Sequence, residues 1–292
     1  AFAIFLGVWS VLASGVQTSL GEIPGPAQVY EEAKGLVADH YAEREKEAAF
    51  YERQKKRVAE AVAEDPAADV TMRTWTGKRT YLDQIVTSLY TVFTGFAIGT
   101  VVAIPLGILC GLSRTFQIAI NPLIQIFRPV SPLAWLPIVT IVISAIYTSQ
   151  DPMFEKSFIV SAITVTLCSL WPTLINTAVG VASIDKDLMN VSKVLRLSAW
   201  TKVTKIVLPS SLKLIFTGLR LALGVGWMVL IAAEMLAQNP GLGKFVWDEF
   251  QNGSSHSLGR IMVAVFTIGF VGFMLDRMMA TLQQLVSFGE AS

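Results

Sequence analysis

Three charged side chains stand within long apolar runs, and they are the residues of this chain best suited to act on a polar solute inside a lipid bilayer. They are Arg128, Arg220 and Glu234. A charge at the centre of a membrane helix costs about 2.5–3.5 kcal/mol on insertion scales, so each one needs a physical reason to be there. A guanidinium can bind an oxyanion through several N–H groups, whereas a carboxylate repels one. We therefore expect the two arginines to meet an anion and Glu234 to have a structural or gating role.

Arg128 stands beside two closely spaced prolines, Pro129 and Pro132. Proline lacks the N–H that a regular helix needs, and irregular backbone at membrane depth is tolerated where it faces protein or a water-filled cavity. We therefore expect a solute pathway that contains Arg128, Ser131, Trp135, Arg220 and Glu234. Two alternatives stay open. Arg128 forms a structural pair with Glu234 or a carbonyl, or Arg220 only extends to the membrane surface.

The elements that position these residues are membrane helices. Of the 292 residues, 53% are apolar and only 15% are charged, and the mean hydropathy is +0.55. Several apolar runs reach the roughly 20 residues that cross a bilayer. We expect an all-α, polytopic membrane protein with six transmembrane helices, of which 1–16 is the outer part of a first helix whose start is missing. The other five are expected at 82–111, 118–147, 157–182, 214–237 and 258–286, with Asp276 and Arg277 at the membrane surface.

Residues 17–80 form a charged insert between the first two apolar segments. The stretch is rich in Ala, Glu, Lys and Arg, and apolar residues recur every four positions at Val29, Ala33, Val37 and Tyr41. This spacing predicts one long helix or two shorter ones, ending at Pro66. The simplest interpretation is a solvated amphipathic helix that lies on the rest of the domain. The alternative is a docking surface for a soluble partner.

Small residues recur at every fourth position in two of the apolar segments. One ridge consists of Gly95, Gly99, Ala103, Gly107 and Gly111, and the other of Gly218, Ala222 and Gly226. Such ridges let membrane helices approach closely, because packing rather than the hydrophobic effect holds a bundle together in lipid. We expect helix packing at both ridges, which is compatible with one of them also forming the wall of a pore.

The sequence lacks the residue patterns of a metal site, a nucleotide-binding loop and an intramembrane enzyme. Cys110 and Cys168 lie in apolar segments away from any CxxC or histidine spacing, and His40 and His256 have no candidate ligands near them in the sequence. We therefore expect buried, reduced thiols and no metal site. The sequence contains no GxxxxGK[ST], so no nucleotide is expected in this chain. No HExxH or inverted repeat of spans supports an intramembrane enzyme or a secondary transporter.

The link at 183–213 is basic and sets the expected orientation. It holds six Lys or Arg residues against two Asp, whereas 148–156 and 238–257 each hold one lysine and two acidic residues. By the positive-inside rule the link is cytoplasmic. With six spans, both termini then lie inside and the 17–80 insert lies outside.

Within this link the sequence predicts a helix, a tight turn and a second helix. Val191, Val194 and Leu195 form an apolar face, and a second short helix runs from "LSAW" to Pro209, where a new helix begins. Proline is tolerated in the first turn of a helix. Short amphipathic helices at a cytoplasmic surface suit either the membrane surface or the groove of a partner protein.

The same link resembles the cytoplasmic coupling loop of inner-membrane permeases of binding-protein-dependent ABC importers. Asn190-Val191-Ser192 stands at the EAA position of their motif, Arg196 stands where glycine is usual, and "IVLP" at 206–209 matches. "FRPVSPLAWLPIVTIVIS" (127–144) and "VLIAAEMLAQNPGLGKFVWDEF" (229–250) are similar to the nitrate, sulfonate and taurine branch. "SLWPTLINTAVGVASIDKDLMNVSKVLRLSAW" and the insert "GEIPGPAQVYEEAKGLVADHY" look closest to nitrate and nitrite permeases.

The resemblance implies a type I importer permease in a bacterial inner membrane, with residues 81–287 as its core. It implies partnership with a second copy, two cytoplasmic ATP-binding subunits that hold ATP and Mg²⁺, and an extracytoplasmic solute-binding protein, but not with nucleic acid. Lipid surrounds the helices. The cargo that the resemblance implies is nitrate or nitrite, with bicarbonate, taurine or an alkanesulfonate as alternatives. The residues expected to contact the ATP-binding subunits are Asn190, Ser192, Arg196, Leu197, Trp200, Lys202 and Pro209.

The loop at 238–256 is expected on the outer side. Asn239-Pro240-Gly241 predicts a turn, and Phe245, Trp247 and Phe250 are spaced like one face of a short helix. We expect Pro240, Gly241, Phe245 and Trp247 to seat the binding protein or to cover the mouth of the pathway. The alternative is that the aromatic residues anchor the loop at the membrane surface.

Overall fold

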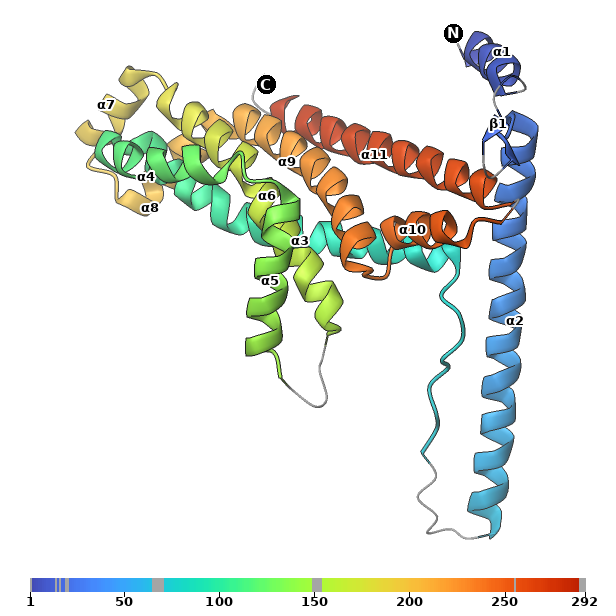
Figure 1. Cartoon of the computed structure of the whole chain (residues 1–292). Helices are drawn as coiled ribbons and strands as arrows, with labels where there is room; N and C mark the ends of the chain where they lie inside the picture. The colour runs from blue at the N-terminus through green and yellow to red at the C-terminus, as the bar shows by residue number, and fades with distance from the viewer. Residues whose placement is uncertain are drawn as a thin grey trace. The chain divides into compact units, whose positions relative to one another are not determined.

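The computed structural model describes residues 2–13, 15, 17, 18, 21–64, 71–148, 154–254 and 256–288. Its first helices are α1 (Phe2–Ala13), α2 (Pro26–Glu64), α3 (Tyr81–Leu112), α4 (Arg114–Phe127), α5 (Pro132–Ile146) and α6 (Lys156–Ala182) (Figure 1). They are followed by α7 (Lys186–Val194), α8 (Ala199–Lys202), a π-helical turn (Val203–Val207), α9 (Leu208–Ala237), α10 (Leu242–Asn252) and α11 (Ser257–Phe288). A short ribbon, β1 (Gln17–Thr18) paired with β2 (Gly21–Glu22), accompanies them.

Among the described residues, four helices are long and apolar enough to cross a membrane. These are Tyr81–Leu112, Lys156–Ala182, Ala199–Ala237 and Ser257–Val286, and the bent pair of α4 and α5 makes a fifth if it counts as one span. The apolar helix α1, with 12 residues, is the one that the sequence assigns to the first of six spans. The predicted all-α membrane fold is therefore confirmed, apart from the two-residue strands.

The chain divides into two compact units. The first contains Ala1–Val86 and Phe245–Val265, and the second contains Thr87–Lys244 and Phe266–Ser292.

In the first unit, residues 26–64 of the charged insert fold as one continuous helix, α2. It ends at Glu64, and Pro66, the predicted stop, lies outside the described residues. Val29 and Leu36 are buried, whereas Val37 and Tyr41 are exposed. Ala33 is half-buried, so the predicted face was wrong from Val37 onward. The reason is that a strict four-residue repeat drifts around a helix of 3.6 residues per turn, whereas a seven-residue step does not drift as far. Arg260 ties α2 to α10 and α11 through Glu32 at 3.4 Å and Glu249 at 3.4 Å.

In the second unit, α6 packs between the two predicted ridges of small residues. A Cβ atom on Gly107 of α3 would lie 2.6 Å from Cβ of Thr177, and one on Gly218 of α9 would lie 2.8 Å from Cβ of Asn176. The helices α6 and α9 run side by side in Figure 1. The predicted role of both ridges in helix packing is confirmed.

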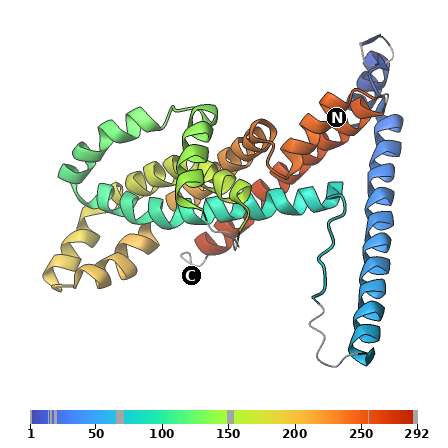
Figure 2. The ribbon, with the colours of Figure 1, turned by 60° about the horizontal axis from the view of Figure 1, so that its bottom comes forward.

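The apolar segment expected at 118–147 is interrupted at Pro129 and Pro132, where the sequence predicts irregular backbone. The chain forms two helices, α4 and α5, that are bent by 99° at the break between Phe127 and Pro132 (Figures 1 and 2). The physical reason is the pair Pro129 and Pro132, which supply no N–H to continue the hydrogen-bond ladder.

An α-helix begins at Leu208 with Pro209 in its first turn, as predicted, but no break in the helical structure precedes it. Helical structure runs without interruption from Ala199 to Ala237. A π-helical turn at Val203–Val207 precedes the proline. In such a turn the hydrogen bonds reach one residue further along the chain than in an α-helix. This altered pattern lets the helix pass Pro209, which has no N–H to donate.

Candidate functional site

The break between α4 and α5 is held by local hydrogen bonds at Arg128 and Ser131. The Arg128 N–H donates to the Ile124 carbonyl at 3.0 Å and ends α4. The Ser131 hydroxyl accepts a hydrogen bond from the Leu133 N–H at 3.3 Å and caps α5. Ser131, predicted in the pathway, therefore has a capping role that fixes where the second helix starts.

Trp135 packs against the break. Its ring lies 5.7 Å from the ring of Phe127, which in turn is stacked on Trp171 of α6 at 6.5 Å. Large aromatic rings in contact stabilise a fixed helix crossing. Trp135 thus joins both sides of the bend to α6, which supports the position of Arg128.

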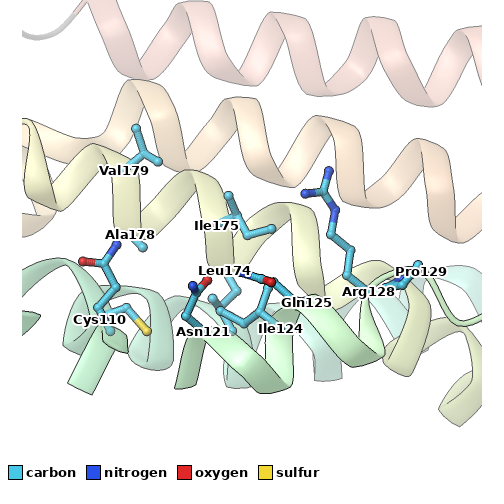
Figure 3. Close-up of a pocket in the computed structure, with 11 residues that line it drawn as sticks. Cys110, Asn121, Ile124, Gln125, Arg128, Pro129, Leu174, Ile175, Ala178 and Val179 are labelled. Carbon is cyan, nitrogen blue, oxygen red and sulfur yellow. The ribbon is translucent and has the colours of Figure 1, made fainter. Parts of the chain in front are cut away.

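A groove of about 710 Å³ lies along α4 and α6. Figure 3 shows Asn121, Ile124 and Gln125 of α4 beside Leu174 and Ile175 of α6, with the Arg128 side chain extending from the end of α4. The lining residues are Cys110, Gln117, Asn121, Ile124, Gln125, Arg128, Pro129, Leu174, Ile175, Ala178 and Val179. They include one cation and no carboxylate. Such a lining suits an anion, because its polar groups are a guanidinium and amides that can donate N–H bonds.

A second groove of about 490 Å³ lies along α5, on the other side of the break. Its polar side chains come from Thr140, Ser144, Lys156, Ser157 and Asn239, and again no carboxylate lines it. Each side of the bend therefore carries a groove with one cationic residue.

Glu234 occupies a different environment from Arg128. It is buried, the Ser88 hydroxyl donates to its carboxylate at 2.8 Å from Oε1, and the Gly243 N–H donates to Oε2 at 2.9 Å. The Ser88 oxygen in turn accepts a hydrogen bond from the Leu242 N–H at 2.9 Å. Glu234 therefore fastens the turn after α9 to α3, and these donors stand in place of the pairing with Arg128 that the sequence left open.

The predicted turn at Asn239-Pro240-Gly241 wraps closely over this carboxylate. Gly241 has φ +152°, and a Cβ atom there would lie 2.2 Å from the carboxyl carbon of Glu234. The Asn239 side-chain amide donates to the Ser161 hydroxyl at 2.6 Å. Pro240 and Gly241 thus belong to a packed structural turn.

Arg220 pairs with Asp276 of α11 in a two-pronged ion pair. The distances are 2.5 Å from Nε to Oδ1 and 2.7 Å from Nη2 to Oδ2, and each side chain is a little over a third exposed. The pair lines a groove of about 580 Å³ with Gly224 and Met228. The packing of α9 on α11 gives Asp276, expected at the membrane surface, a cationic partner 56 residues earlier in the chain.

The link at 183–213 presents an exposed apolar patch next to basic residues. Its members are Leu188, Val191, Val194, Leu195 and Trp200, and Trp200 is 77% exposed. Met189 and Val203 pack instead against the core cluster of Ile108, Val181 and Val207. The link is thus anchored to the ends of α3 and α6 while its apolar patch stays open. Asn190 and Arg196 are also exposed, Leu197 and Lys202 are half-buried, and Ser192 is buried and donates to the Met189 carbonyl.

Arg196 stands in a backbone conformation that explains why glycine is usual there. Its φ is +45°, in the left-handed region. Its N–H donates to the Lys193 carbonyl, and the Leu197 N–H donates to the Ser192 carbonyl, both at 3.0 Å. This is the arrangement that ends a helix at a left-handed residue, a conformation that costs a non-glycine residue about 1–2 kcal/mol.

The aromatic residues of α10 do not share one face, so that expectation was wrong. Phe245 is buried and packs against Tyr81 at 4.7 Å between ring centroids. Trp247 packs against Phe250, which is exposed, at 5.8 Å. The reason is that residues two apart on a helix differ by about 200° in direction. Trp247 and Phe250 are the aromatic residues that this loop leaves accessible.

Three polar residues of α4 lie in the groove although they were not among the predicted pathway residues. Gln117, Asn121 and Gln125 are spaced by four and all line the groove that contains Arg128. The signal was present in the spacing, but the high apolar content of 118–147 concealed it.

A known protein family matches most of the second unit and part of the first. Residues 103–288 match the family described as binding-protein-dependent transport system inner membrane component. Over 70% of its length the chain also matches a structure of the MetNI methionine ABC transporter, and it covers 95% of that chain with a TM-score of 0.59 and 13% identity. This similarity shows the fold.

Nitrate and bicarbonate permeases are among the proteins that are similar in sequence. The nitrate import permease protein NrtB of Synechocystis is 33% identical over 286 residues, which are 98% of this chain and 87% of that protein. The bicarbonate transport system permease protein CmpB of Synechocystis is 41% identical over 208 residues, 71% of this chain and 69% of that protein.

Proposed function

This chain belongs to the family of binding-protein-dependent inner-membrane transport components, and from that premise we propose that it carries nitrate or nitrite into the cell. It is a transport subunit of the inner membrane with the type I ABC importer permease fold. In the proposed mechanism, ATP and Mg²⁺ are bound by separate cytoplasmic subunits, and a solute-binding protein delivers the anion to the outer face. Two copies of the chain enclose the pathway and alternate between outward-open and inward-open states.

The main support for nitrate as the cargo is the length of this chain over which nitrate permeases are similar to it. Two nitrate permeases align over 98% and 94% of this chain, so they share the α2 region as well as the core. The charge of the grooves agrees with an anion, because Arg128 and Lys156 line them and no carboxylate does. An anion needs weak, exchangeable contacts on such a route, because tight binding would slow its release.

Bicarbonate is the second candidate. The CmpB proteins reach 39–41% identity, although over about 70% of the chain. Both anions are small and trigonal and carry a single charge, so the same arginine can bind either one.

The proposed drive acts through the exposed patch of the link at 183–213. Leu188, Val191 and Trp200 present apolar surface with Lys193 and Lys202 nearby in the sequence, which suits a groove in a partner protein. Because Met189, Val203 and Val207 anchor the link on the bundle, a movement of the partner would be passed to α6 and α9.

A reconstitution experiment tests the proposal. The chain is assembled with its ATP-binding subunits and solute-binding protein in proteoliposomes, and the accumulation of nitrate is followed with an ion-selective electrode. We expect nitrate uptake that requires both ATP and the binding protein. Uptake of labelled bicarbonate or taurine without nitrate uptake would contradict the choice of cargo, and uptake independent of ATP would contradict the class of transporter.

A further inference from the structure

The helix α4 has three distinct faces. Phe116, Ile120 and Ile124 pack on the core cluster that includes Leu174 and Cys110. A second face is apolar and exposed, with Ile118, Leu123 and Ile126 between 50% and 65% accessible. The third face lies between these two and is polar. Its residues, the α4 polar stripe, are Arg114, Gln117, Asn121, Gln125 and Arg128, spaced by three or four positions.

The side chains of the α4 polar stripe make no hydrogen bonds or ion pairs within the described part of the chain. All five of these side chains are exposed. Gln117, Asn121, Gln125 and Arg128 line the groove of about 710 Å³ against α6. A polar face with no partner in the described part of its own chain, in a helix that also has an exposed apolar face, is expected to face water or a polar ligand.

The chemistry of the stripe selects the charge of that ligand. It consists of three amides between two guanidinium groups, and α4 contains no acidic residue. Guanidinium groups donate N–H bonds in a planar fork that matches a trigonal oxyanion, and amide NH₂ groups add neutral donors. A cation would find the amide oxygens but two positive charges beside them.

The place of the groove along the chain indicates which half of the route it serves. Its far wall is Leu174–Val179, in the last turns of α6, and α6 leads directly into the link at 183–213. Arg128 and the bend lie at the other end of α4. The stripe therefore runs from the bend toward the end of the bundle that carries the link.

We propose that the α4 polar stripe is a series of weak binding positions for the transported oxyanion, which guides it from the bend at Arg128 toward the cytoplasmic exit. The proposal rests on the proposed function, in which the cargo is a small anion. Several neighbouring donors of similar strength let an anion move from one to the next, whereas one strong site would retain it.

The first test replaces the amides and leaves the bend intact. In the reconstituted transporter, the double variant Asn121→Leu with Gln125→Leu should lower ATP-driven nitrate uptake by about tenfold, because two donors to the anion are lost. The matched control, Ile118→Leu with Ile126→Leu on the apolar face, should keep uptake within about twofold, because these swaps conserve volume and polarity. Copurification of the ATP-binding subunits reports assembly in both variants. Normal uptake by the Asn121/Gln125 variant would overturn the proposal.

The second test asks whether the stripe is wet and whether the anion reaches it. Single cysteines are placed at Gln117, Asn121 or Gln125 and, as controls, at Ile118, Leu123 or Ile126, in a chain with Cys110→Ala and Cys168→Ala. A negatively charged methanethiosulfonate should modify the stripe positions and be slowed there by nitrate. It should leave the control positions unmodified.

The outcomes separate this proposal from the proposed function. If the wild-type assembly transports nitrate but the stripe cysteines stay unmodified, or react equally fast with and without nitrate, the stripe does not bind cargo. If the wild-type assembly transports no nitrate but accumulates labelled bicarbonate, the choice of cargo fails. The labelling test, repeated with bicarbonate, then decides the role of the stripe.

Discussion

The buried carboxylate of Glu234 accepts the hydrogen bonds that join the end of α9 to its neighbours. Ser88 and the Gly243 N–H donate to it, and the turn that contains Gly241 closes over it. A buried polar group is stable only when hydrogen bonds within the protein replace those to water. At the scale of single residues, the carboxylate is therefore an internal fastener between α3 and the turn after α9, which agrees with the structural role expected from its sign.

We predict that Gly241→Ala and Ser88→Ala both destabilise the protein at this fastener. Ser88→Ala removes one of the two donors to the buried carboxylate and leaves the Leu242 N–H without its acceptor, at a cost of about 1–3 kcal/mol. Gly241→Ala places a methyl group on the carboxylate at a φ that side chains rarely adopt. Both changes should lower the melting temperature of the purified protein in detergent. An unchanged melting temperature in Gly241→Ala would contradict the close approach of the turn.

A second prediction concerns the ion pair of Arg220 with Asp276. Single replacements, Arg220→Asp or Asp276→Arg, place like charges together on α9 and α11, so both should lower thermal stability and nitrate uptake. The exchange Arg220→Asp with Asp276→Arg should restore stability. If uptake returns as well, the pair is structural. If stability returns and uptake does not, the Arg220 guanidinium contacts the cargo as first expected.

At the scale of elements, contacts between helices depend on glycines that leave no room for a side chain. On α3, Cβ atoms at Gly95, Gly107 and Gly111 would each lie within 2.5–2.6 Å of an atom of α6. Backbones that approach this closely gain dispersion contacts along the whole crossing, which is the main source of association between membrane helices. The positions of α3 and α6 then determine where the grooves beside α4 and α5 can lie.

We predict that Gly107→Ala lowers stability by about 1–3 kcal/mol, because the new methyl group must displace Thr177 or the Leu174 carbonyl. Gly269→Ala on α11 is the matched control, since a Cβ atom there meets nothing within 4 Å. It should change stability by about 1 kcal/mol or less, with alanine favoured in a helix. Thermal melting of the two variants side by side measures the difference, and equal melting temperatures would contradict the packing of α3 on α6.

At the scale of the whole molecule, the proposed transport requires that movement of the ATP-binding subunits is passed to the membrane helices through the link at 183–213. Trp200 is the one aromatic residue in the sequence of that link, and its side chain is exposed. We predict that Trp200→Glu releases the ATP-binding subunits during purification and leaves the membrane helices folded, because a charge replaces apolar surface in the contact. Phe250→Glu, which changes an exposed aromatic residue of α10, is the control that should retain them. If the Trp200→Glu variant shows copurification and uptake at wild-type levels, the ATP-binding subunits act on another part of the chain.

Much of this architecture follows from local chemistry. Apolar runs of sufficient length indicated α3, α6, α9 and α11, because lipid admits only helices with satisfied backbones. The ridge at Gly95–Gly111 indicated a close helix contact, and the pair Pro129 and Pro132 indicated irregular backbone. The resemblance of the link at 183–213 to a coupling loop indicated the family. These features depend on composition and spacing within one segment, which a sequence displays directly.

The tertiary structure alone decided which distant groups meet. Ser88 and Glu234 are 146 residues apart, and Arg220 and Asp276 are 56 apart, so no local spacing could pair them. The prolines showed that the third apolar segment is interrupted, but the 99° bend depends on how Phe127, Trp135 and Trp171 pack. The sequence determines which helices form and which of their faces are polar. Packing determines which face meets which, because it sums many weak contacts between segments that the linear order keeps apart.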